Sequence, residues 1–308
     1  SFAFLFYMDR CKEERERGVT IQCTLKEFFT PQFHYTIIDA PGHRDFIKNM
    51  ITGASQADVA ILLVPADGNF TTAIAKGDHK SGEIQGQTRQ HARLLNLLGV
   101  KQLIVAVNKM DTDVAKYSKE RYDEVSSEMR STLVRVGWKK DFVEKSVPVI
   151  PISGWMGDNL LKKSEKMAWW NGQDVVCQDG SKLHADTLLD CLDKYVKLPP
   201  RQTDKPMRMP VSGMYKIKGV GDVVTGRVEQ GIVTPGDEVA FLPTHTSSNK
   251  CSGKVFSIEM HHQRIEKAMP GDNVGLNMKG LDKQNMPRTG DVMVLTKDPS
   301  LKSAGQFT

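Results

Sequence analysis

The stretch Leu103-Ile104-Val105-Ala106-Val107-Asn108-Lys109-Met110-Asp111 joins a run of apolar residues directly to a polar loop. The same arrangement occurs where Thr36-Ile37-Ile38 leads to Asp39-Ala40-Pro41-Gly42-His43, and where residues 148–152 lead to Ser153-Gly154-Trp155. Polar groups that follow parallel strands meet at one edge of the sheet, where phosphate-bearing ligands bind. The three loops therefore predict one nucleotide site at the carboxyl ends of three strands.

Segments with strand and helix periodicity alternate around these loops. In chain order, we expect a hairpin over 21–30 and 33–39, a helix over 44–53 ended by Gly53, a strand over 59–64, a helix over 87–98 ended by Gly99, a strand over 103–107, a helix over 118–136, a strand over 147–152 and a helix over 185–196. Strands that alternate with helices favour a mostly parallel sheet. The first domain is therefore predicted to be of the α/β class.

The pattern changes near residue 200. Four prolines lie among charged residues between 199 and 210, a composition that stiffens a linker and interrupts a helix. Beyond Met209, short apolar runs are separated by Gly-Asp pairs, which favours an antiparallel β-barrel. We therefore expect an α/β domain over 1–200, a barrel over 201–305 and the start of a further domain at 306–308.

Composition excludes several classes of protein. The five cysteines are odd in number, scattered and without C-x-x-C spacing, which argues against a disulfide framework or a zinc site and favours a reducing, cytoplasmic location. The apolar run over 59–65 is far shorter than the roughly 20 residues that cross a bilayer, so no membrane span is expected. The net charge of +5 permits a polyanionic partner such as RNA without requiring one.

The loop Asn108-Lys109-Met110-Asp111 predicts recognition of guanine. The Asp111 carboxylate can accept hydrogen bonds from the guanine N1 and N2 donors, a pair that adenine does not offer. Asn108 is expected to hold the purine edge and to tie loops together, the Lys109 stem to cover the ring, and Gly154 in the Ser153-Gly154-Trp155 loop to offer its amide to the base carbonyl. The alternative interpretation is a plain Asn-Lys surface turn.

The Asp39 loop predicts the phosphate end of the same site. Asp39 is expected to hold Mg²⁺ through water, and the Gly42 amide to approach a terminal phosphate. His43 is expected to orient the attacking water, although a histidine here can also cap the following helix. The charged segment over 15–20 ends in Thr20, whose hydroxyl is placed to reach Mg²⁺ when a γ-phosphate is bound.

Four motifs carry a resemblance to a known family: Arg-Glu-Arg-Gly-Val-Thr over 15–20, Asp-Ala-Pro-Gly-His-Arg-Asp-Phe-Ile-Lys-Asn-Met-Ile-Thr-Gly over 39–53, Asn-Lys-Met-Asp over 108–111 and Pro-Ile-Ser-Gly-Trp over 151–155. With these motifs in order, nearly the whole chain resembles eukaryotic translation elongation factor 1-alpha. Three further segments are more similar to its divergent relatives, the elongation-factor-like (EFL) GTPases of some protists and algae. These segments are 76–86, 137–140 and 218–222.

The resemblance implies an α/β P-loop GTPase-type domain followed by a β-barrel. It implies a GTPase that uses GTP, GDP and Mg²⁺ and carries aminoacyl-tRNA to the ribosomal A site, with a guanine-nucleotide exchange factor as a candidate partner. No G-x-x-x-x-G-K-[ST] pattern occurs. The resemblance therefore implies that the phosphate loop with its N-terminal strand is missing, and it also implies a missing third domain. We therefore predict poor GTP binding and no activity for residues 1–308 alone.

The resemblance also implies where the aminoacylated end of tRNA binds. An apolar floor for the terminal adenine, a carboxylate near it, and His and Asn beside the esterified amino acid suit that ligand. The implied residues are Tyr215, Ile217, Gly219, Val223, Glu259, His261 and Asn273. For the segment 259–262, the alternative is an alternating strand with exposed polar residues.

Two rival functions remain open. A GTPase of termination or ribosome rescue carries a protein in place of charged tRNA, and so should lack the constellation of Glu259, His261 and Asn273. A non-catalytic binding or scaffold protein has no need of the loops at 39–43 and 108–111. The insertion over 76–86 is expected near the second switch, the segment that begins with the Asp39 loop, where it bears on partner contacts. The alternative is a solvated loop.

Overall fold

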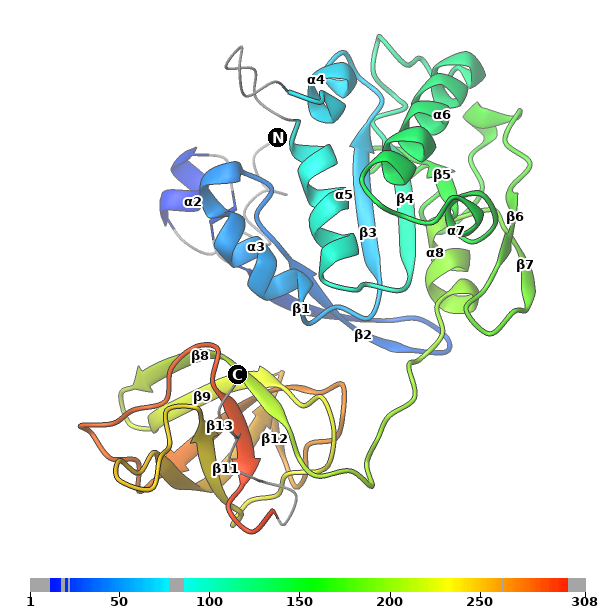
Figure 1. Ribbon diagram of the computed structural model, residues 1–308. Coiled ribbons are helices and arrows are strands. Elements are labelled where there is room, and N and C mark those ends of the chain that lie inside the picture. The colour runs from blue at the N-terminus through cyan, green and yellow to red at the C-terminus, as the bar shows by residue number, and fades with distance from the viewer. Residues whose placement is uncertain (1–11, 18–19, 22, 78–85, 262, 299–308) are drawn as a thin grey trace, which may run out of the picture. The chain divides into compact units, whose positions relative to one another are not determined.

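The computed structural model describes residues 12–17, 20–21, 23–77, 86–261 and 263–298, and the chain divides into two compact units, 1–198 and 199–308 (Figure 1). Most of the predicted insertion over 76–86 lies outside the described residues. The predicted start of a further domain at 306–308 lies wholly outside them. The elements of the first unit are α2 (Lys12–Arg17), β1 (Thr24–Phe29), β2 (His34–Asp39), the 3₁₀ turn η1 (Arg44–Phe46), α3 (Ile47–Ala54), β3 (Ala60–Pro65), α4 (Phe70–Ile74), α5 (Gln87–Leu97), β4 (Leu103–Asn108), α6 (Lys119–Arg135), α7 (Lys140–Lys145), β5 (Val149–Pro151), η2 (Glu165–Met167), β6 (Gln173–Val176), β7 (Lys182–Ala185), α8 (Leu188–Asp190) and the π-helical turn η3 (Cys191–Tyr195).

The core of the first unit is a parallel sheet in the order β3-β4-β5, which confirms the α/β prediction. The first five residues of β4 are wholly buried, because α5 packs against β3 and α6 against β4 (Figure 1). The register aligns Pro65 with Asn108 and Val107 with Pro151, so the three strands end side by side. The hairpin β1-β2 forms a separate antiparallel sheet whose last pair is Thr24 with Asp39.

The predicted role of Gly53 as the end of a helix is wrong. Gly53 is buried inside α3, and its backbone lies outside the left-handed region that a glycine helix stop adopts. A Cβ at this position would lie 2.7 Å from Cys23 Sγ and 3.0 Å from Ile38 Cγ2. The glycine therefore allows α3 to pack closely on the hairpin that carries Asp39.

Other helix boundaries follow ordinary capping rules. Gly99 has φ of +76° and ends α5 as predicted, while the Ser118 side chain caps α6 by accepting from the Arg121 amide. The predicted helix over 185–196 is wrong in its first part, because Ala185 ends β7 and the helical region begins only at Leu188. The capping box between Thr187 and Asp190 fixes that start.

The second unit is a closed antiparallel β-barrel, as the Gly-Asp spacing predicts. Its strands are β8 (Met209–Ile217), β9 (Gly221–Arg227), β10 (Glu238–Leu242), β11 (Ser252–Met260), β12 (Gln263–Ile265), β13 (Asn273–Lys279) and β14 (Val292–Leu295). The order β10-β14-β8-β9-β13-β11 is closed by pairing of β11 with β10, and β12 pairs antiparallel with the C-terminal end of β11. Asp237, Asp272 and Asp291 each accept the amide three residues earlier, so the same turn recurs between strands.

Four cysteines lie in the described part of the chain, and each is a free thiol. These are Cys23, Cys177, Cys191 and Cys251. Among the described helices, none combines the length and apolar character that a membrane crossing requires.

Candidate functional site

Asn108 joins the two loops that follow β4 and β5. Its Oδ1 accepts hydrogen bonds from the Lys109 amide at 2.7 Å and from the Gly154 amide at 2.9 Å. Lys109 has φ of +65°, which turns the chain sharply after the strand. The structure thus commits the Gly154 amide to Asn108, whereas the sequence interpretation directs that amide to the base carbonyl.

The Asp111 carboxylate is held in place by a buried serine. Ser153 is fully buried, and its hydroxyl donates to Asp111 Oδ1 at 2.6 Å while accepting from the Met156 amide at 3.0 Å. The buried residue Met110 holds this loop against the end of β5, since its amide donates a hydrogen bond to Ile152 O at 3.2 Å. Both oxygens of a carboxylate can accept more than one hydrogen bond, so Asp111 retains acceptor sites for a ligand.

Asp67 is a contributor that sequence reasoning missed. Its carboxylate accepts from Lys109 Nζ at 2.8 Å and from the Asn69 amide at 3.0 Å. Burial alone raises the pKa of Asp67, but the hydrogen bonds from Lys109 and Asn69 outweigh burial and lower that pKa overall. The rule that selected Asp39 and Asn108 also applies here, because Asp67 lies two residues after the end of β3.

Arg121 braces the turn that carries Asp67. Its Nε donates to Ala66 O and its NH2 group to Asp67 O, both at 2.8 Å. The guanidinium lies 5.6 Å from the centre of the Phe70 ring and also pairs with Glu124 at 2.7 Å. The C-terminal end of β3 is therefore tied to α6.

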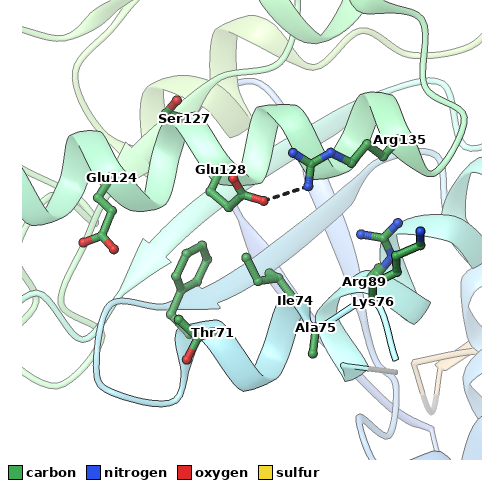
Figure 2. Close-up of a pocket in the computed structure, with 10 residues that line it drawn as sticks. Thr71, Ile74, Ala75, Lys76, Arg89, Glu124, Ser127, Glu128 and Arg135 are labelled. Carbon is green, nitrogen blue, oxygen red and sulfur yellow. Dashed lines mark hydrogen bonds and ion pairs between the residues drawn. The ribbon is translucent and has the colours of Figure 1, made fainter. Parts of the chain in front are cut away.

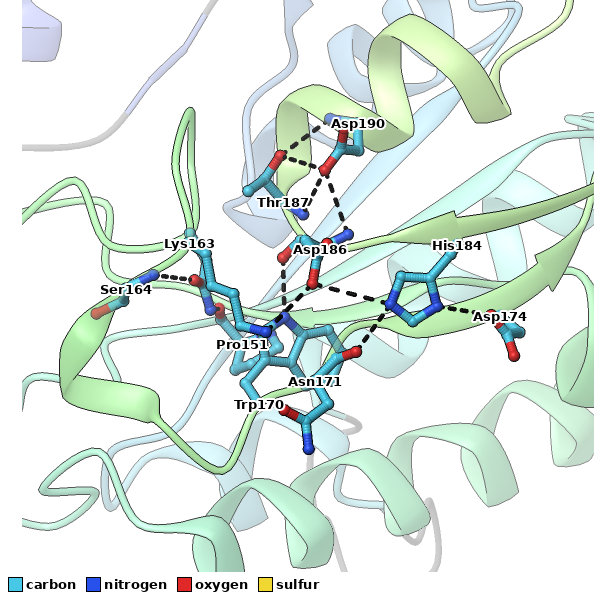
Figure 3. Close-up of polar contacts among 11 residues, drawn as sticks. Pro151, Lys163, Ser164, Trp170, Asn171, Asp174, His184, Asp186, Thr187 and Asp190 are labelled. Atoms are coloured by element: carbon cyan, nitrogen blue, oxygen red, sulfur yellow. Dashed lines mark hydrogen bonds and ion pairs between the residues drawn. The ribbon is translucent and has the colours of Figure 1, made fainter.

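The loop after β5 is anchored by a polar network with the hairpin β6-β7 and α8 (Figure 3). Buried Asn159 donates to Pro151 O at 2.8 Å and accepts from the Ser164 amide at 2.7 Å. Behind it, Trp170 Nε1 donates to Asp186 O at 2.8 Å. These bonds fix the segment that contains Ser153 and Gly154, whereas Trp155 beside them is 63% exposed.

A cavity of about 890 Å³ lies beside the Asp39 loop and is lined by Asp39, Gly42, His43 and His91. A Cβ at Gly42 would lie 3.7 Å from the His91 ring, an ordinary contact, and the Gly42 backbone lies outside the left-handed region. Burial lowers the pKa of His91, and a hydrogen bond with the Gly42 backbone partly offsets that effect. Neither packing nor backbone strain therefore explains a glycine at position 42.

His43 directly precedes the 3₁₀ turn η1 and is partly exposed. The Asp45 amide lies 3.3 Å and Asp45 Oδ2 3.5 Å from its Nδ1, and in the tautomer in which Nδ1 accepts from the amide the neutral ring carries its proton on Nε2. The ring lies 5.9 Å from the Phe46 ring. In that tautomer Nε2–H is a hydrogen-bond donor, as a role in orienting water requires.

The segment that contains Thr20 is pinned to α3. The Ile21 amide donates to Glu14 Oε1 at 2.9 Å, and Asn49 Nδ2 donates to Ile21 O at 2.7 Å. Cys23 Sγ adds a bond to Asn49 O at 2.9 Å. Because α3 follows the His43 turn, these contacts hold the Thr20 segment against the helix that leads out of the Asp39 loop.

In the second unit, the predicted tRNA-end residues gather on the outer face of the barrel. Tyr215 of β8 pairs with Val223 of β9. Two residues further along β9, Thr225 pairs with Gly275 of β13, and Gly275 in turn pairs with Glu259 of β11. Alternate residues of a strand share a face, and those between them, such as Val224, Val274 and Leu276, are buried in the core. Ile217 lies two residues after Tyr215 on β8, and the register of β13 against β9 places Asn273 in line with the Val223 positions. Both predicted residues therefore belong to the same face.

Two details make this face suited to a ligand. A Cβ at Gly213 would lie 2.8 Å from Tyr215 Cε2, so the glycine leaves room for the Tyr215 ring, which is 56% exposed. Asn273 Oδ1 is a buried acceptor that receives no hydrogen bond from the described residues. Gly219 lies in the β8-β9 turn with φ of +84°, and His261 follows β11 with φ of +51°.

Family models match both units in chain order. The model of the elongation factor Tu GTP-binding domain matches residues 3–198, and that of elongation factor Tu domain 2 matches residues 221–294. Elongation factor 1-alpha of Hyperthermus butylicus is 45% identical over 293 residues, which cover 95% of this chain and 60% of the relative. Elongation factor 1-alpha of Absidia glauca is 45% identical over 309 residues, covering 100% of this chain and 63% of the relative.

A solved structure shares the fold. The crystal structure of translation elongation factor SelB from Methanococcus maripaludis, in complex with the GTP analogue GPPNHP, aligns with a TM-score of 0.62 and 25% identity. The alignment covers 91% of this chain and 50% of that chain. This chain thus spans about three fifths of the length of the two elongation factor 1-alpha relatives. The finer resemblance to elongation-factor-like GTPases stays a prediction. Because one family accounts for both units in order, the chain belongs to the elongation factor Tu family of GTP-binding translation factors.

Proposed function

We propose that this chain is part of a translation elongation GTPase that delivers aminoacyl-tRNA to the ribosomal A site and hydrolyses GTP on codon recognition. The proposal is carried by the hydrogen-bonded unit of Asn108, Asp111, Ser153 and Gly154 at the ends of β4 and β5. The two relatives named elongation factor 1-alpha, and the SelB complex with a GTP analogue, support it.

Discrimination of guanine is assigned to Asp111. Ser153 holds one carboxylate oxygen, so the group is oriented before a base arrives and loses little freedom on binding. A base that lacks the paired donors would leave Asp111 with unmet acceptors, which is costly at a partly buried site. Lys109, held by Asp67, would keep its stem beside the ring, and Trp155 follows Gly154 in the loop after β5.

The phosphate end of the site offers oxygen donors, which suit Mg²⁺. Asp39 supplies a carboxylate at the end of β2, and Thr20 supplies a hydroxyl in the segment pinned to α3. We assign both to Mg²⁺, which when bound offsets the negative charge of the phosphate oxygens. The Gly42 amide is assigned to the terminal phosphate, a role consistent with a glycine that packing does not require.

His43 is assigned the positioning of the attacking water. With its proton on Nε2, the neutral ring donates a hydrogen bond to the water oxygen, and the Asp45 amide fixes the ring through Nδ1. This arrangement orients water without removing a proton from it, so the nucleophile is aligned rather than ionised by His43.

The barrel face is assigned to the aminoacylated end of tRNA. The exposed Tyr215 and Ile217 provide apolar surface on which an unstacked adenine can lie. Glu259, Asn273 and His261 would contact the ribose and the esterified amino acid. The buried Asn273 Oδ1 supports this role, because an acceptor without a donor among the described residues is stabilised by one from a ligand.

Gel-shift experiments with the whole protein test the carrier function against its rivals. We expect a complex with charged tRNA in GTP, and much weaker complexes with uncharged tRNA or in GDP. Glu259→Gln should weaken the complex by about tenfold, while Glu266→Gln, an exposed glutamate of the same unit outside the proposed face, should not. Equal shifts with charged and uncharged tRNA would support a termination or rescue factor or a scaffold.

Cytoplasmic location, binding to the ribosome and service by an exchange factor are part of the same proposal. Membership of a family of translation factors supports them. Co-sedimentation with ribosomes in the presence of a non-hydrolysable GTP analogue, compared with GDP, tests the ribosomal part directly.

A further inference from the structure

A second pocket, separate from the loops described above, lies between α4, α5 and α6 (Figure 2). Its volume is about 1000 Å³, which is at the upper end of the range for small-molecule sites. Phe70, Ile74 and Ala75 form an apolar wall. In Figure 2, Lys76 and Arg89 lie near one end of the pocket and Glu124 lies at the other.

The acidic residues of this pocket already have cationic partners. Glu124 pairs with Arg121 at 2.7 Å, and Glu128 pairs with Arg135 at 3.0 Å. Both pairs are close enough to compensate the two carboxylates. The remaining lining charges are therefore those of Lys76 and Arg89.

Arg89 is the unusual member of the set. It is only 9% exposed, and its Nε is a buried donor with no hydrogen-bond partner. No ion pair joins Arg89 or Lys76 to any other residue in the described part of the chain. A buried guanidinium donor without an acceptor is costly, because burial removes the hydration of Nε and no hydrogen bond replaces it.

The position of Arg89 in its helix increases that cost. Arg89 is the third residue of α5, and Gly86 caps the helix without a side-chain hydrogen bond. The first turn of a helix carries partial positive charge from its free amides, which disfavours a cation and favours an anion. One anionic group in the pocket would therefore compensate the guanidinium and the helix end together.

We propose that this pocket binds a small organic anion. Its carboxylate or phosphate group would pair with Arg89 and Lys76, and its apolar body would lie against Phe70 and Ile74. Arg suits this role because its planar donors match the two oxygens of such a headgroup. The pocket is lined by residues outside the loops at 39–43, 108–111 and 153–155, so the proposal does not rest on the function proposed above.

Ligand-observed ¹⁹F NMR on the 308-residue chain tests the proposal with 4-fluorobenzoate and 4-fluorophenyl phosphate, which separate the two headgroups, and with neutral 4-fluorobenzyl alcohol. We expect at least one anion to bind and the alcohol not to bind. Arg89→Met should weaken anion binding by about tenfold or more, since a charged hydrogen bond is removed. Lys76→Gln, at an exposed position that should not affect folding, should weaken it by about threefold.

Arg93→Gln serves as the matched control, because Arg93 lies one turn further along α5, is exposed and does not line the pocket. It should leave binding unchanged, as should Asp111→Asn, which acts on the nucleotide loops. Circular dichroism shows whether each variant is folded. Failure of both anions to bind, equal binding of the alcohol, or unchanged binding in both folded Arg89→Met and Lys76→Gln would overturn the proposal.

Discussion

Replacement of Gly53 by alanine separates two explanations of this glycine. Alanine favours a helix interior by about 1 kcal/mol over glycine, so Gly53→Ala should stabilise α3 if only helix propensity matters. The structure predicts the opposite sign, because the new Cβ would lie 2.7 Å from Cys23 Sγ and 3.0 Å from Ile38 Cγ2. Overpacking of this kind costs about 1–3 kcal/mol, which leaves a net destabilisation of up to about 2 kcal/mol.

Urea unfolding followed by tryptophan fluorescence measures this difference. The four tryptophans all lie before residue 198, so their emission reports the first unit alone. Thr52→Ala, a partly exposed position in the same helix, is the control and should change stability by less than about 0.5 kcal/mol.

The double variant with Cys23→Ala makes the test specific. Removing Sγ opens the space that the new Cβ needs, so Gly53→Ala should cost less in that background by about 1 kcal/mol. Because Ile38 precedes Asp39, the single variant should also displace the Asp39 loop. A stabilised Gly53→Ala variant, or an equal cost with and without Cys23, would refute the packing argument.

Three further predictions concern the nucleotide loops. In the whole protein, Asp111→Asn should reduce the preference for GTP over ITP by about tenfold in competition binding, because a paired acceptor is lost; an unchanged preference would exclude Asp111 as the guanine determinant. His43→Ala should slow GTP hydrolysis on ribosomes in single-turnover assays and leave nucleotide affinity unchanged, whereas unaltered turnover would contradict its role. Asp67→Asn should destabilise the first unit by about 1 kcal/mol at pH 7, as measured by urea unfolding. The lowered pKa of Asp67 means that this difference is full above the ordinary value of 3.8 and disappears as the pH falls through the native value, so a constant difference down to pH 2 would exclude the ion pair with Lys109.

Strand positions and loop chemistry were accessible from sequence because they depend on neighbouring residues. A run of apolar residues that ends in a polar loop marked β4 and Asn108, and Gly99 ended its helix for a purely local reason, its positive φ. Gly53 was misread because the contact that requires it comes from Cys23 and Ile38, in other parts of the chain. Asp67 was missed although it follows a strand, since only the folded chain shows that Lys109 reaches it.

The sequence by itself determined the class of each unit and the identity of the loops that bear the nucleotide chemistry. These follow from periodicity and from residue type, which act over a few residues. Only the tertiary structure decided which groups are committed to one another, such as Ser153 to Asp111 and Gly154 to Asn108. It also decided where a charge such as that of Arg89 is buried without a partner, because burial and pairing depend on segments that meet only when the chain folds.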